Sequence, residues 1–137
     1  SFSSSIFLTG GSETGFACPD NLAFDKKGNL WFSSDIAGNQ TNKSPYSAFK
    51  NNGLFFVAMQ GPEAGQVIQV ASAPVHAEFT GICFSTDGKS LFLSVQHPGE
   101  FSRDLEHMDS HWPEGGNAMP KPSVIVIEGE FLDNSCV

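Results

Sequence analysis

The chain has 137 residues, a formal net charge of −8 and a hydrophobic fraction of 39%. This is the length of one domain or of a piece of a larger one. No apolar stretch approaches the roughly 18 residues that a transmembrane helix needs, and seven Lys and Arg against 15 Asp and Glu provide no basic surface for nucleic acid. We therefore expect no membrane span and no nucleic-acid partner, while 13 Phe, 14 Gly and 8 Pro favour short strands separated by turns.

Short apolar runs separated by Gly, Asn and Pro predict strands along most of the chain. A tight hairpin turn is expected at residues 25–29, where Gly28 suits a positive φ. Two long polar segments, residues 36–52 and 96–122, are predicted to be loops. The predicted strands, about eight in all, are residues 4–9, 22–24, 30–33, 54–59, 66–70, 82–84, 91–95 and 124–127.

The hairpin pattern repeats 60 residues further along the chain, so that Gly28 matches Gly88. A repeat of antiparallel units is typical of β-propeller blades, and a small β-sandwich is the alternative. We predict an all-β fold of about two antiparallel propeller blades in one partial domain. The predicted parts are a first blade at residues 16–74, a second blade at 75–130 and a flexible tail at 131–137.

Two blades do not close a propeller ring, which takes about 4–8 of them. An open ring exposes apolar blade faces, and such faces drive association. The chain is therefore expected to be a fragment of a longer propeller, or to assemble with copies of itself.

Polar residues at the strand starts form the candidate site. Asp20 and Asn21 stand before the first strand of the first blade and offer the oxygen ligands that Ca²⁺ prefers, although an Asx turn explains them equally. Glu78 occupies the same place in the second blade, so both blades are predicted to direct a ligand at one channel end. His97 follows a strand and is predicted to be a general acid, a ligand or an anion contact, with a capped turn as the alternative.

Four segments in this order resemble the C-terminal part of the PhoX-type alkaline phosphatases: CPDNLAFDKKGNLWFSSD, EFTGICFSTDGKSLFLSVQHPGE, SHWPEGG and KPSVIVIEG. The resemblance extends from about residue 10 to residue 129. It implies a six-bladed propeller whose channel holds calcium and iron and hydrolyses phosphate esters, in a secreted or periplasmic protein. The Pro-Asp-Asn start also resembles paraoxonase- and gluconolactonase-like propellers, which keeps a calcium-dependent lactonase or esterase as an alternative.

The resemblance assigns roles position by position. Glu78 matches a metal-binding Glu, and Asp20 and Asn21 match the motif at the start of a blade. His76 stands where the family's active-site Arg is expected, so His76, together with His97, is expected to face the phosphate. The exchange of Arg for His replaces a bidentate contact by a titrating one, which favours a third alternative, a non-catalytic scaffold.

The resemblance places the cysteine ligand of iron and other metal-binding acids on earlier blades. The isolated chain is therefore expected to lack appreciable phosphatase activity, and it need not bind calcium or iron by itself. The expected partners are the remaining blades or copies of the chain, with small phosphate esters as substrates of the intact protein.

Overall fold

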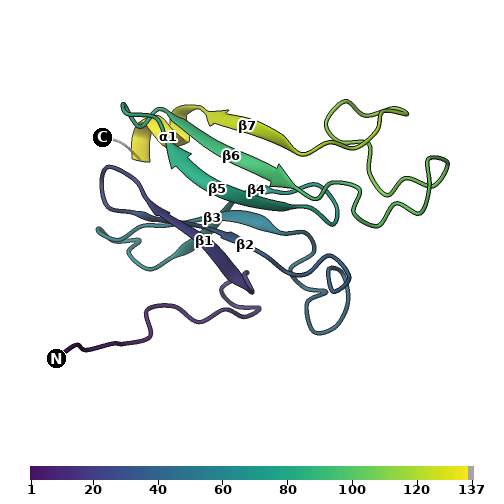
Figure 1. Ribbon diagram of the computed structural model, residues 1–137. Helices are drawn as coiled ribbons and strands as arrows, with labels where there is room; N and C mark the ends of the chain where they lie inside the picture. The colour runs from purple at the N-terminus through teal and green to yellow at the C-terminus, as the bar shows by residue number, and fades with distance from the viewer. Residues whose placement is uncertain (136–137) are drawn as a thin grey trace.

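The computed structural model describes residues 1–135 as two antiparallel sheets and one short helix (Figure 1). The strand order is β1-β2-β3-β4 in the first sheet and β5-β6-β7 in the second. The predicted all-β, antiparallel class is confirmed, with seven strands in the described residues. The elements are β1 Pro19–Phe24, β2 Leu30–Ser34, β3 Gly53–Val57, β4 Val67–Ser72, β5 Glu78–Phe84, β6 Ser90–Gln96, β7 Ser123–Glu128 and α1 Glu130–Ser135.

The first hairpin of each sheet is closed by a similar turn. Gly28 donates its backbone N–H to Asp25 O at a φ of 81°, and Gly88 donates to Ser85 O at a φ of 80°. Glycine adopts these positive φ angles without steric cost. β1 and β5 also share a register shift near their starts. The 60-residue repeat in the sequence therefore corresponds to a repeated structure.

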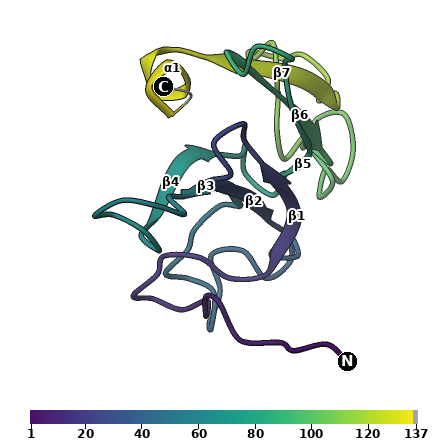
Figure 2. The same cartoon turned by 90° about the vertical axis from the view of Figure 1, so that its left-hand side faces the viewer.

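The two sheets pack face to face because strand side chains alternate between the two faces of a sheet. Trp31, at 0% exposure, packs edge-on against the rings of Phe56 and Phe84. Figure 2 shows the sheets as two layers with α1 beside their junction. The buried residues of this core are Trp31, Leu54, Phe56, Ala73, Ala77, Phe79, Leu91, Leu93, Val95 and Leu132.

One sequence prediction at the N-terminal end is wrong. Residues 4–9 form no strand, and all of them except the half-buried Leu8 are exposed. Residues 131–135 belong to helix α1, in which Leu132 is buried and Phe131 packs against Trp31, and the flexibility of the tail stays a prediction. Residues 136 and 137 lie outside the described residues.

Both strands that begin a sheet start earlier than the sequence suggested. β1 begins at Pro19, so Asp20 and Asn21 lie within the strand instead of before it, and Glu78 is the first residue of β5. The β2–β3 and β6–β7 loops extend from the same end of the molecule (Figure 1). Within residues 1–135, no helix is long and apolar enough to cross a membrane.

Candidate functional site

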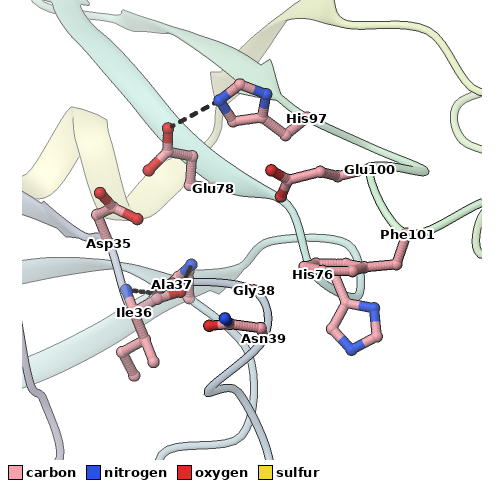
Figure 3. A pocket seen from close by; sticks show the side chains of 11 residues that line it. Asp35, Ile36, Ala37, Gly38, Asn39, His76, Glu78, His97, Glu100 and Phe101 are labelled. Carbon is pink, nitrogen blue, oxygen red and sulfur yellow. Dashed lines mark hydrogen bonds and ion pairs between the residues drawn. The ribbon is translucent and has the colours of Figure 1, made fainter.

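A cavity of about 370 Å³ lies at the end of the sheets from which the two long loops extend (Figure 3). Among the described residues, those that line the cavity include three carboxylates and two imidazoles but no lysine or arginine. The cavity is therefore acidic, and an ion or ligand inside it would have to offset that charge. The lining residues are Asp35, Ile36, Ala37, Gly38, Asn39, Asn52, His76, Glu78, His97, Glu100 and Phe101.

Glu78 is the most shielded carboxylate of this cavity. Its side chain is 12% exposed, because it is fixed at the start of β5 between the two sheets. Glu78 Oε1 lies 3.8 Å from Nε2 of His97, whereas Oε2 is buried without a hydrogen-bond partner among the described residues. An unpaired buried carboxylate oxygen is unfavourable, so this atom is suited to a ligand that the chain itself does not supply.

The pKa of Glu78 is raised to about 7. Burial is the largest cause, because it disfavours the charged form. The neighbouring Asp35 carboxyl is the next cause, and the charges of Asp20 and Glu100 add to it. Figure 3 shows the carboxylates of Asp35 and Glu100 directed toward the same space as Glu78. Repulsion among these groups is the electrostatic condition that a bound cation relieves.

The sequence prediction missed Asp35. This residue directly follows β2, as His97 directly follows β6. Its backbone N–H donates to Cys18 O at 2.9 Å, which holds it beside the start of β1. The second strand of each sheet is thus followed directly by a polar residue that lines the cavity. The sequence signal that could have identified Asp35 is its place directly after the predicted strand, at the end of the run Ser-Ser-Asp.

Asn21 connects the two sheets. Its Oδ1 accepts the backbone N–H of Gly81 at 3.0 Å, and its amide nitrogen donates to Asp20. The amide oxygen that the sequence prediction offered to a metal is thus engaged across the β1–β5 junction. Asp20 is exposed and acts on Glu78 through its charge. The metal-binding roles of Asp20 and Asn21 stay predictions.

His76 and His97 differ in how they face the cavity. His97 directs its imidazole at Glu78, whereas the imidazole of His76 points away from the carboxylates and lies beside Phe101 (Figure 3). Nδ1 of His76 is 2.7 Å from Oδ2 of Asp109. The structure therefore brings together Glu78, His97 and Asp35, and it pairs His76 with a residue that the sequence prediction did not name.

Asn52 is a buried part of the cavity wall that sequence reasoning also missed. Its Oδ1 accepts the backbone N–H of Ile36 at 2.6 Å and the Ser34 hydroxyl at 3.3 Å. Its Nδ2 donates to Ile36 O at 3.0 Å and to Ala77 O at 3.2 Å. This one amide therefore holds the β2–β3 loop against the segment that precedes β5.

Replacing Asn52 by alanine is expected to lower the free energy of unfolding by about 2–3 kcal/mol, because it deprives buried backbone groups of their partners. Urea denaturation followed by tryptophan fluorescence measures the change. Asn51→Ala is the matched control, since Asn51 is half-buried and donates to Ala73 O at 3.3 Å. Equal losses in the two variants would contradict the role given to Asn52.

Within residues 1–135, no three Asp, Glu, His or Cys side chains are placed so that they could hold a metal ion together. Glu78 and Asp35 can therefore supply only part of a coordination sphere. Any further ligands would have to come from residues outside this set.

Comparison with known proteins explains this partial site. The family model for alkaline phosphatase PhoX matches residues 7–99, which is more than half of the chain. The chain belongs to the PhoX family. A solved structure of Pseudomonas fluorescens PhoX, in complex with vanadate as a transition state analogue, is 34% identical to this chain with a TM-score of 0.67. The comparison with curated proteins gives no match.

The match to the Pseudomonas PhoX structure covers 83% of this chain but only 18% of that protein. This agrees with the predicted fold, a fragment of a β-propeller, and the two sheets are called the first and second blade below. The chain therefore spans less than a fifth of the length of its solved PhoX relative.

Proposed function

We propose that this chain forms part of the metal-dependent active site of a PhoX phosphatase that hydrolyses phosphate esters as the intact protein. The observation that carries the proposal is the buried, unpaired Oε2 of Glu78 in an acidic cavity. Membership of the PhoX family supports the reaction. The proposed location is the periplasm or the exterior of the cell, as the family resemblance implies.

The donor set at the cavity suits calcium. Glu78 and Asp35 would hold the ion, with Glu100 and Asp20 adding negative charge nearby, and carboxylate oxygens are the ligands that Ca²⁺ prefers. A bound calcium ion would polarise a phosphoryl oxygen and offset the charge that develops there. Iron is proposed to reside on parts of the PhoX protein that this chain does not contain.

His97 is proposed to contact the phosphate group. Its side chain is 50% exposed at the cavity, and its Nε2 lies 3.8 Å from Glu78 Oε1. An imidazole N–H in this position can donate to a phosphate oxygen or to the leaving group. The side-chain nitrogen of Gln96 lies 2.9 Å from Nε2 of His97 and helps to fix the ring.

Calcium binding to the purified full chain tests this proposal. A partial site is expected to bind with a Kd on the order of 10⁻³ M. Calcium at about ten times that concentration should stabilise the fold by about 1.4 kcal/mol, seen as a higher thermal midpoint. Glu78→Gln should abolish the shift because it removes the charge at the unpaired oxygen, and Glu63→Gln, at an exposed site, should keep it. An equal shift of the thermal midpoint in both variants, or no shift in the wild type, would contradict the proposed calcium site.

The chain by itself is proposed to lack phosphatase activity, because it supplies too few ligands. Assay with p-nitrophenyl phosphate, with calcium and iron present, should give no turnover above background. Robust hydrolysis would contradict this. Lactone turnover by the intact protein, without phosphatase activity, would instead favour the lactonase alternative. An intact protein that holds neither metal would favour a non-catalytic scaffold.

A further inference from the structure

One wall of the cavity is held in place by a contact between His76 and the β6–β7 loop. His76 lies in the turn between β4 and β5, and its Nδ1 is 2.7 Å from Oδ2 of Asp109. The imidazole also packs edge-on against the ring of Phe101, with 5.2 Å between centroids. The His76 and Asp109 side chains are only 26% and 19% exposed. This pair is therefore better shielded from water than an ordinary surface ion pair.

The β6–β7 loop, which His76 contacts, folds back on itself so that Asp109 meets an earlier part of the loop. The backbone N–H of Asp109 donates to the Ser102 hydroxyl at 3.0 Å, and the Ser102 N–H donates to Gly99 O at 3.0 Å. Residues 97–109 thus form a closed loop, with Asp109 fixed at the point where it meets His76.

Phe101 lies against the β2–β3 loop although its side chain is partly exposed. A Cβ added at Gly38 would lie 2.5 Å from Cε2 of Phe101 and 3.2 Å from the backbone oxygen of His76. Only glycine at this position lets the ring approach the β2–β3 loop so closely. His76 itself has a φ of 60°, a left-handed conformation that is unfavourable for a residue other than glycine. The surrounding contacts have to hold it there.

The loop held in this way carries three of the cavity residues, His97, Glu100 and Phe101. We infer that Asp109 is a positioning residue, which through His76 holds residues 97–109 over the cavity and so sets where His97 and Glu100 stand relative to Glu78. We call this pair the His76–Asp109 clasp. It gives His76 a role in positioning that differs from the predicted direct contact with phosphate. Its consequence for metal binding rests on the proposed function, whereas the clasp itself rests on the contacts alone.

Hydrogen exchange of the full chain without metal, followed by mass spectrometry, tests the clasp. Asp109→Ala should speed the exchange of amides in residues 97–109 about tenfold, because this loop then opens more often, while the amides of β2 and β3 keep their protection. His76→Asn should have the same effect, since Asn tolerates a positive φ but is too short to reach Asp109. The double variant should exchange no faster than either single one, because both remove the same interaction.

A second histidine–aspartate pair in the same loop provides the matched control. His107 Nδ1 lies 2.8 Å from Asp104 Oδ1, and both side chains are more than half exposed. His107→Ala should leave the exchange of the loop unchanged within about twofold. Asp109→Asn, whose amide oxygen can still accept a hydrogen bond from Nδ1, should restore most of the protection.

Unchanged exchange in both Asp109→Ala and His76→Asn would overturn the clasp, as would an equal increase in His107→Ala. If Asp109→Ala also loses protection in β2 and β3, its fold has failed, and His76→Asn together with Asp109→Asn decides the question. Calcium titration separates the two proposals. A clasp that controls exchange in a chain that binds no calcium supports the positioning role and contradicts the proposed metal site.

Discussion

Replacing Trp31 by alanine is expected to lower the free energy of unfolding by about 3–5 kcal/mol, the largest effect of any single substitution proposed for this chain. Trp31 is fully buried between the blades and contacts the rings of Phe56, Phe84 and Phe131. Its Nε1 donates to Asp25 Oδ2 at 3.1 Å, so it also supports the first hairpin turn. Urea denaturation followed by far-UV circular dichroism measures the loss.

Two variants separate the causes of this loss. Trp31→Phe keeps most of the ring contacts and removes the hydrogen bond to Asp25, so it should lose about 1–2 kcal/mol. Phe2→Ala, at a site that is 93% exposed, should leave the stability within about 0.5 kcal/mol of the wild type. A loss in Trp31→Ala no larger than that of Phe2→Ala would show that the interface between the blades does not hold this chain together.

Replacing Glu78 by glutamine is expected to stabilise the metal-free chain at pH 8 and to change little at pH 5. The pKa of Glu78 is raised from its ordinary value of 4.5 to about 7 in the folded chain, mainly by burial and by Asp35. The folded state therefore holds a proton that the unfolded state has released between these values. The contribution of this proton to the stability of the fold is fully present below about pH 4.5 and is lost as the pH rises through 7.

The expected size of the Glu78 effect is on the order of 1–2 kcal/mol after allowance for solvent screening. Unfolding free energies of wild type and Glu78→Gln should be measured from pH 5 to pH 8 without metal. The difference between the two curves isolates the effect of Glu78, because all other titratable groups are common to both proteins. Parallel curves would contradict the raised pKa of Glu78.

The stability and the proposed function of the chain conflict at Glu78. An apolar or neutral residue there would improve the metal-free fold, because the acidic cavity repels its own charges. A carboxylate is useful at this position only when a cation offsets that repulsion. The same substitution is therefore expected to stabilise the chain and to remove its response to calcium, a pair of opposite effects that a purely structural glutamate would not produce.

The sequence by itself determined the class of the fold and its repeat. Short apolar runs between turn residues predicted the strands, and the glycines at positions 28 and 88 marked the two equivalent turns, because both signals depend on residues that are close in the chain. The specific motifs also identified the PhoX family, which the comparisons confirm. Glu78 was singled out by its place at the start of a blade, and it lines the cavity, while its metal-binding role stays a prediction.

Only the tertiary structure decided what surrounds these residues. Asp35, Asn52 and Asp109 reach the cavity or its wall from loops whose course no local pattern specifies, and each interacts with a residue distant in the sequence: Glu78, Ile36 and His76 respectively. Residues 130–135 form a helix whose Leu132 is buried in the core between the blades, while residues 4–9, predicted as a strand, form none. Pairing across long loops depends on packing in three dimensions, and that packing places His76 against Asp109.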